Sequence, residues 1–194
     1  MKFHARALLT AALSLGICTA LSAAVETYTI DPVHSSVGFS IRHFVAKVPG
    51  RFTKFSGTIV IDRENPANSR VEATIEAASI DTGNPKRDTH LRTADFLHTD
   101  QFPAITFKST SWKQTGDDTY EVTGDLTLKD VTKPVVLKVT SLGFGPGAGG
   151  AQLSGWEATT TINKKEFNVI DPPKLNLALG DEVDVIINIE AKKA

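Results

Sequence analysis

Hydrophobic and polar side chains alternate in one short segment after another from Val25 to the end of the chain. Between residues 36 and 42, for example, Val37, Phe39 and Ile41 are apolar, and the residues between them are polar or glycine. Successive side chains of a β-strand point to opposite faces, so each such segment has one apolar and one polar face. The pattern recurs in about eight segments separated by turn residues, which predicts an antiparallel sandwich or barrel.

A single segment shows helical spacing instead. Its apolar residues fall on one side of a helix, and Asp88 precedes them as the expected N-cap. No linker or internal repeat divides the rest of the chain. The sequence therefore predicts one all-β domain, residues 25–194, with one short helical insert near residues 88–98.

Residues 1–24 have the order of a secretory signal peptide. Lys2 and Arg6 precede an uncharged run of apolar and small residues, 7–21, and three small residues follow it. The run is shorter than the about 20 apolar residues that a membrane-spanning helix needs. We therefore expect cleavage after residue 24, a periplasmic mature protein, and no stable insertion of that protein into the membrane.

The charge of the chain excludes one class of partner. The formal net charge is −1, so there is no basic field that would attract nucleic acid. Hydrophobic residues make up 41% and charged residues 22% of the chain, which is typical of a folded globular protein. We expect no nucleic-acid partner.

Residues that carry chemistry are sparse. The only cysteine, Cys18, lies in the signal segment, so the mature chain offers no thiolate. The histidines show no His-x-x-x-His spacing, which disfavours a metal site. Asp31, His34 and Ser35 are the residue types of a nucleophilic triad, but they share one extended segment without a nucleophile elbow. We expect no catalytic residue, no metal and no cofactor.

Eight strands close into a barrel whose interior is either filled with side chains or holds one small ligand. Strand parity places many apolar side chains inside, and several phenylalanines lie near strand ends, where a barrel would open. The alternation alone leaves a filled barrel and a ligand-binding barrel both open. The expected lining residues are Val37, Phe39, Ile41, Phe44, Phe52, Ile59, Ile75, Phe96, Phe102, Ile105, Phe107, Leu126, Leu128, Leu137, Trp156, Ile162, Phe167, Val185 and Ile187.

Short motifs along the mature chain resemble the YceI-like family of polyisoprenoid-binding periplasmic proteins. The resemblance runs from about Tyr28 to Ala191 and keeps the family's order. The motifs are Asp31-Pro32-Val33-His34-Ser35-Ser36-Val37-Gly38-Phe39, Val48-Pro49-Gly50-Arg51-Phe52, Ser79-Ile80-Asp81-Thr82, Arg87-Asp88-Thr89-His90-Leu91, Phe102-Pro103-Ala104-Ile105-Thr106-Phe107, Gly124-Asp125-Leu126-Thr127-Leu128 and Val131-Thr132-Lys133-Pro134-Val135.

This resemblance implies a lipocalin-like eight-stranded barrel that sequesters or transports one long isoprenoid (polyprenyl or quinone-type) or other acyl lipid, without catalysis. The chain departs from the family at two turns. Asp130 stands where glycine is common, and Lys164-Lys165-Glu166-Phe167-Asn168 replaces an Arg-x-Asp-Phe-Gly pattern. Because Asp and Asn tolerate left-handed backbone, we expect both turns to form.

Candidate contacts for a ligand head group are His34, Arg42, Arg87, Asp88 and His90. Arg87, Asp88 and His90 stand near the start of the predicted helix, close to a barrel end, where cations bind phosphate or quinone oxygens. The alternative is that these residues form a capping and ion-pair cluster with a purely structural role.

Two other functions remain open at this point. One is an enzyme that acts on a lipid held in the barrel. The other is a filled barrel that binds partner proteins through its loops, around Gly147 or Pro172. Outer strands of such barrels can also pair two copies, so a homodimer is left open.

Overall fold

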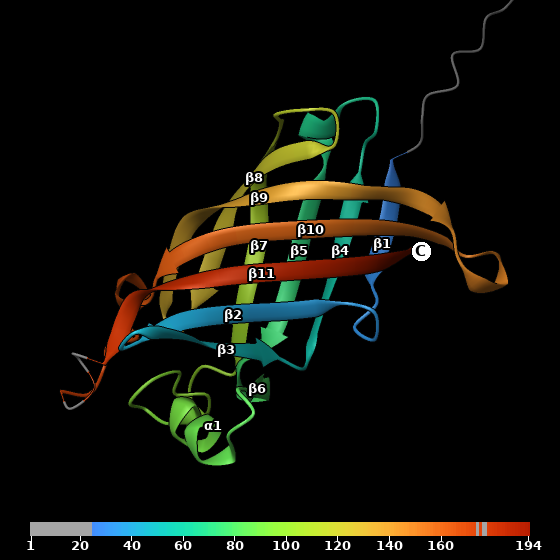
Figure 1. Ribbon diagram of the computed structural model, residues 1–194. Coiled ribbons are helices and arrows are strands. Elements are labelled where there is room, and N and C mark those ends of the chain that lie inside the picture. The colour runs from blue at the N-terminus through green and yellow to red at the C-terminus, as the bar shows by residue number, and fades with distance from the viewer. Residues whose placement is uncertain (1–24, 174, 176–177) are drawn as a thin grey trace, which may run out of the picture.

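The computed structural model describes residues 25–173, 175 and 178–194, so the expected signal peptide lies outside the described residues. One sheet contains the described strands, and one α-helix lies beside it (Figure 1). The elements are β1 (Glu26–Ile30), β2 (Ser36–His43), β3 (Ala46–Phe52), β4 (Phe55–Ile61), η1 (Pro66–Asn68), β5 (Arg70–Glu76), η2 (Ala77–Ser79), β6 (Ile80–Asp81), α1 (Pro85–Arg92), β7 (Ala104–Gln114), β8 (Thr119–Leu128), β9 (Val131–Pro146), η3 (Ala148–Gly150), β10 (Gln152–Asn163), η4 (Lys164–Phe167) and β11 (Leu179–Lys193).

Eight strands close an antiparallel barrel, which confirms the predicted fold class. Their order is β1-β4-β5-β7-β8-β9-β10-β11, and β11 pairs back with β1 through Thr29 and Lys192. The alternation fits this arrangement, because each strand turns its apolar face inward only in one register. Closure also removes the free sheet edges that would otherwise invite aggregation.

The strand β11 has two neighbours on one side. Its first part pairs with β2 from Val183 to Asn188, and its last part, Ala191–Lys193, pairs with β1. The strands β2, β3 and β6 therefore branch away from the barrel (Figure 1). We call the end where β1 joins β11 the closed end. The flared end comprises the β2–β3 turn, α1, η4 and the chain between η4 and β11.

The helix prediction is confirmed in existence and wrong in its bounds. The helix α1 begins at Pro85, and Asn84 is its N-cap, with a side-chain oxygen that accepts from two backbone N–H groups of the first turn. A proline at the first helical position is pre-set for this start. Asp88, the expected cap, lies inside the helix, is buried, and accepts from the backbone N–H and hydroxyl of Thr82.

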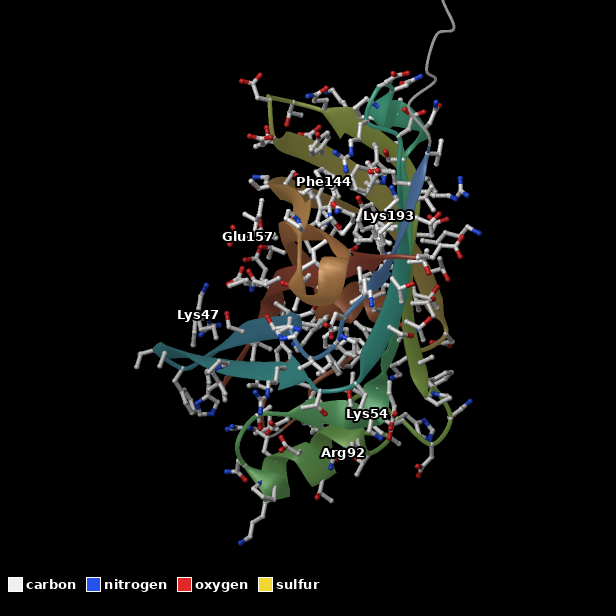
Figure 2. The ribbon with its side chains drawn as sticks, turned by 90° about the vertical axis from the view of Figure 1, so that its right-hand side faces the viewer. Lys47, Lys54, Arg92, Phe144, Glu157 and Lys193 are labelled. Atoms are coloured by element: carbon white, nitrogen blue, oxygen red, sulfur yellow. The ribbon has the colours of Figure 1, made fainter. Side chains whose placement is uncertain are left out.

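Arg92 attaches the last turn of α1 to the sheet. Its Nε donates to the Ala78 carbonyl at 2.7 Å and its Nη2 to the Ile80 carbonyl at 2.8 Å. Figure 2 shows Arg92 below the sheet, near Lys54. The helix is thus fixed to η2 and β6. Within the described part of the chain, no helix has the length and apolar character needed to cross a membrane.

The two turns that depart from the family pattern contact one another. Asn168 adopts left-handed backbone, with φ of 57°, as expected. In the β8–β9 turn the left-handed residue is Lys129 rather than Asp130. The Lys129 ammonium donates to the Asn168 carbonyl at 2.7 Å, and the Asn168 amide donates to Asp130 at 3.4 Å. The two replacements therefore support each other.

Candidate ligand-binding site

An apolar cavity of about 480 Å³ occupies the barrel interior. This volume lies within the range of roughly 300–1,000 Å³ that small-molecule sites have. Side chains from the barrel strands, from the branch β2–β3 and from α1 line it, and nearly all of them are aliphatic or aromatic. The filled-barrel alternative, in which side chains occupy the whole interior, therefore does not describe this fold. The polar side chains of the lining are His43, Ser56, Thr82, Arg87, His90, Thr160 and Lys164.

Sixteen of the nineteen apolar residues expected in the lining surround this cavity. They share the inward parity of strands or, in one case, follow α1. They are Val37, Phe39, Ile41, Phe52, Ile59, Ile75, Phe96, Ile105, Phe107, Leu126, Leu128, Leu137, Trp156, Ile162, Val185 and Ile187.

The structure places the other three, Phe44, Phe102 and Phe167, away from the cavity. Phe44 lies in the β2–β3 turn and is 58% exposed. Phe102 is half-buried and packs edge-on against His98. Phe167 is buried at the end of η4, among the side chains of the flared end. These residues lie in turns and loops, where strand parity does not fix the direction of a side chain.

The sequence reasoning missed part of the lining in the strands, such as Trp112, Val122 and Val139, and most of the part that comes from loops. Leu91 and Leu97, in and after α1, line the flared end, as do Val169 and Leu175 between η4 and β11. It also missed Lys164. The only local signal for Lys164 was its position in the motif that departs from the family pattern.

Two glycines make room for aromatic side chains in the lining. A Cβ atom built on Gly50 would lie 2.3 Å from the Phe39 ring, and one on Gly124 would lie 2.4 Å from the Phe107 ring. The outer atoms of both rings therefore lie in the space that a Cβ atom would occupy. This close approach keeps two large side chains from filling the cavity.

The cavity meets solvent at the flared end. Four of its lining residues are also exposed, and three of them, His43, Arg87 and His90, lie at the end of β2 and on α1. The fourth, Ser56, lies near the start of β4. A residue that is exposed and also lines a cavity marks an opening, so the main opening lies between the β2–β3 turn and α1.

Arg87 and His90 contribute polar groups to this opening. Arg87 donates from Nε to the Thr82 hydroxyl at 2.7 Å and from Nη2 to the Thr82 carbonyl at 2.9 Å. The same hydroxyl donates to the buried carboxylate of Asp88, which does not line the cavity. His90 Nε2 pairs with the Asp95 carboxylate at 2.6 Å. Of the expected head-group contacts, the structure thus brings Arg87 and His90 to the cavity and uses Asp88 to hold Thr82.

Lys164 is the one fully buried charge in the described lining. Its side chain is 6% exposed, and its Nζ lies 2.8 Å from Asp171 Oδ2 and 2.9 Å from the Gly180 carbonyl. The Asp171 side chain is 1% exposed, and its Oδ1 has no hydrogen-bond partner among the described residues. The pair joins η4 to the chain before β11 and so fixes one wall of the flared end.

His34 and Arg42 do not line the cavity. His34 is exposed beside the closed end, with Nδ1 2.8 Å from Asp31 and 3.6 Å from Glu190. The hydrogen bond to Asp31, followed by the charges of Asp31 and Glu190, raises the pKa of His34 above its ordinary value. The hydrogen bond from His34 lowers the pKa of Asp31. Arg42 is exposed and donates to the Phe44 carbonyl.

One group of described residues has ligand atoms close enough together for a metal ion. The atoms of Asp31, His34 and Glu190 lie within 4.8 Å of one another. The group is on the surface, away from the cavity, and its geometry is that of an ion pair between His34 and two carboxylates. It is therefore separate from the apolar site.

The closed end is packed with aromatic side chains. Trp156 stands edge-on to Trp112 at 5.8 Å and to Phe144 at 5.5 Å, measured between ring centroids. Its indole N–H donates to the Ser154 hydroxyl at 3.0 Å. Figure 2 looks onto this end, with Phe144 and Lys193 labelled near β1. The cavity thus has an aromatic floor at one end and polar groups at the other.

Comparison with other proteins identifies relatives along nearly the whole described chain. The family model of the YceI-like domain matches residues 28–191. Protein YceI of Escherichia coli (strain UMN026) is 43% identical over 173 residues, which cover 87% of this chain and 88% of that protein. A UPF0312 protein of Photorhabdus laumondii is 40% identical over 178 residues, 90% of each chain.

Solved structures share the fold. BcnA of Burkholderia cenocepacia has a TM-score of 0.77 and 25% identity, and the match covers 83% of this chain and 98% of BcnA. A polyisoprenoid binding domain from Saccharophagus degradans, implicated in plant cell wall breakdown, has a TM-score of 0.67 and 15% identity, with 86% of this chain and 98% of that domain covered. At that identity the second likeness shows the fold alone.

Proposed function

We propose that this chain, which belongs to the YceI-like domain family, binds one long apolar lipid in its barrel. The protein carries or sequesters that lipid without chemical change. An isoprenoid of the polyprenyl or quinone type is the ligand class we favour, and a fatty-acid-derived lipid is the runner-up. A neighbour of the same fold is described as a polyisoprenoid binding domain.

The observation that carries this proposal is the cavity itself. A closed barrel with about 480 Å³ of apolar interior leaves its lining without packing partners unless a ligand fills it. Each buried methylene contributes roughly 0.8 kcal/mol, so ten contribute about 8 kcal/mol, near micromolar affinity before association costs. A chain of that length needs no polar contact to be held.

The distribution of polar groups suggests how the lipid lies. The aromatic floor offers the chain end only apolar surface, whereas Arg87 and His90 stand at the opening. We place the apolar tail toward Trp156 and any polar head group at the flared end, within reach of Arg87 and His90. The Thr82–Asp88 contact then serves to hold Arg87 in place.

We also propose that the protein works in the periplasm after removal of residues 1–24. The support is the order of charges, apolar residues and small residues in that segment. N-terminal sequencing of the protein recovered from periplasmic extract tests this. Val25 as the first residue is the expected result, and a retained Met1 would contradict it.

The test of lipid binding is native mass spectrometry of the mature protein purified without added ligand, followed by organic extraction and identification of the lipid. We expect one extra mass per chain that matches a prenyl or acyl compound. The same spectra report whether the protein is a monomer or a dimer. A protein that purifies empty and takes up neither quinones, polyprenols nor fatty amides would contradict the proposal.

A matched pair of variants ties the bound mass to the cavity. Ala158 lines the cavity on β10, and its neighbour Thr159 is exposed on the outer face. Ala158→Phe places a ring in the cavity, so we expect at least a tenfold loss of bound lipid. Thr159→Phe adds the same ring outside and is expected to keep the lipid. Equal lipid content in the two variants would show that the lipid binds elsewhere.

A further inference from the structure

The β2–β3 turn exposes two consecutive large apolar side chains. Phe44 is 58% exposed and Val45 is 101% exposed. Neither lines the cavity or belongs to a packed cluster of the described residues. Contact of such side chains with water is unfavourable, so folding alone gives no reason for both to stand here.

The turn is held in this arrangement. The Phe44 N–H donates to the Ala178 carbonyl at 2.7 Å, and Arg42 Nη1 donates to the Phe44 carbonyl at 2.9 Å. Phe44 itself has left-handed backbone, with φ of 49°, which is uncommon for a residue of its size. The backbone conformation and both hydrogen bonds keep the apolar pair at the tip of the turn.

The turn stands beside the opening of the cavity. His43, directly before Phe44, is exposed and also lines the cavity. In Figure 1 the β2–β3 turn projects at the end opposite the C-terminus, on the same side of the molecule as α1. A flat surface that received Phe44 and Val45 would therefore lie close to the opening.

Basic side chains flank the apolar tip. Arg42 precedes it and forms no ion pair within the described residues, and Lys47 follows it and pairs with Asp184. Cations around an apolar tip suit an anionic lipid surface, where an unpaired cation such as Arg42 contributes about 1 kcal/mol of attraction, or roughly fivefold in affinity.

We propose that the Phe44–Val45 turn inserts into the surface of an anionic lipid bilayer and sets the opening of the cavity against it. This inference rests on the proposed function. A long apolar lipid is nearly insoluble in water, so its transfer is fastest when the opening touches the membrane that holds it. Side chains of an interfacial element reach about 5–10 Å into the bilayer, a depth suited to two residues at a turn.

The experiment measures co-sedimentation of the mature protein with vesicles of phosphatidylethanolamine and phosphatidylglycerol. The variant Phe44→Ser/Val45→Ser removes the tip, and we expect it to lower vesicle binding at least about tenfold. Val45→Asp is a second variant that cannot disturb the core, because Val45 is fully exposed. It should lower binding by a similar factor, because it adds a negative charge at the anionic surface.

The control is an equally exposed apolar pair at the closed end. Val33 is 81% exposed and Leu142 is 61% exposed. Both lie near Glu190, about 35 Å along β11 from the residue that pairs with His43. We expect Val33→Ser/Leu142→Ser to bind vesicles like the unchanged protein.

Bound lipid, measured by native mass spectrometry, separates this inference from the function on which it rests. Loss of vesicle binding in both tip variants, with lipid still bound in Val45→Asp, supports the inference. Vesicle binding that is unchanged in both Phe44→Ser/Val45→Ser and Val45→Asp overturns the inference. A protein that ignores vesicles but forms dimers that Val45→Asp dissociates would also overturn it, because the tip would then contact a second copy. A protein without lipid that still binds vesicles through the tip would contradict the proposed function instead.

Discussion

The two ends of the barrel each have a buried apolar cluster and differ in what surrounds it. At the closed end, β1 pairs directly with β11, and the rings of Tyr28, Trp112, Phe144 and Trp156 pack together in the interior. The flared end has an apolar cluster of its own, which includes Phe96 and Phe167, and adds polar contacts that cross between loops, above all Lys164 with Asp171. The apolar contacts of the closed end favour stability, and the loops of the flared end allow access, because loops open at lower cost than packed strands.

This difference predicts that substitutions at the two ends affect different quantities. Loss of a side chain at the closed end should lower the free energy of unfolding more than it changes lipid exchange. Loss of a contact at the flared end should affect both. The four substitutions below are ordered from the largest expected effect to the smallest.

Trp156→Ala tests the closed end. Trp156 is 5% exposed and its ring meets those of Trp112, Tyr120 and Phe144. We expect the free energy of unfolding, measured with urea, to fall by about 4 kcal/mol, since the variant leaves a large cavity and an unpartnered hydroxyl on Ser154. Phe52→Ala, in the half-buried lining of the flared end, should lower it by clearly less. Equal losses would remove the distinction between the two ends.

Lys164→Met tests the buried ion pair of the flared end. The variant leaves the Asp171 carboxylate buried without its cation, so we expect a loss of about 3 kcal/mol in urea unfolding. Lys165→Met is the matched control, because its pair with Asp181 at 2.8 Å is half-exposed and is worth under about 1 kcal/mol. Lys164→Met/Asp171→Leu should recover part of the loss. A Lys165→Met variant as unstable as Lys164→Met would show that burial of the pair is unimportant.

Strand residues and loop residues also differ in how far the sequence predicts them. Val37, Phe39 and Val185 lie in the cavity as expected, because strand parity alone determines which face a side chain joins. Parity is undefined in a turn, and this explains why Phe44 and Phe167 were misplaced. The count of alternating segments left a sandwich and a barrel both open, and the family resemblance favoured the closed barrel, whereas the branch of β2, β3 and β6 had no local signal.

The polar part of the site was the least predictable. Lys164 reads as an ordinary surface lysine, and only the fold brings it to Asp171 and the Gly180 carbonyl. Asp88 has the residue type of a helix cap, but Asn84 followed by proline starts the helix earlier. In both cases long-range packing or a neighbouring proline decides the outcome, and a single residue type does not.

Gly50→Ala tests whether glycine keeps the cavity open. The added methyl would lie 2.3 Å from the Phe39 ring, so the ring must turn into the cavity. We expect severalfold less bound lipid by native mass spectrometry and a loss of about 1–2 kcal/mol in urea unfolding. Gly38→Ala is the control, since its methyl meets no atom closer than 3.4 Å. Equal lipid content in the two variants would mean that the Phe39 ring moves without entering the cavity.

The smallest effect concerns pH and the closed end. His34 has a raised pKa, so its contribution to stability is complete below the unfolded value of about 6.5 and is lost as pH rises through the folded pKa. Asp31 has a lowered pKa, so its contribution is present above its unfolded value of about 3.9 and is lost as pH falls through the folded pKa.

His34→Gln should therefore lower the melting temperature slightly, with the full effect at weakly acidic pH between those two unfolded values and a declining effect as pH rises through the folded pKa of His34. The effect is small because both side chains are in contact with solvent, where salt and water screen the pair. Melting curves of the two proteins from pH 4 to 9 should converge at the alkaline end. Lipid content should not change with the substitution, because His34 lies off the cavity. A pH-dependent loss of lipid in His34→Gln would instead show that the ion pair affects lipid binding. The closed end would then determine access to the cavity as well as stability, and the two ends would not have separate roles.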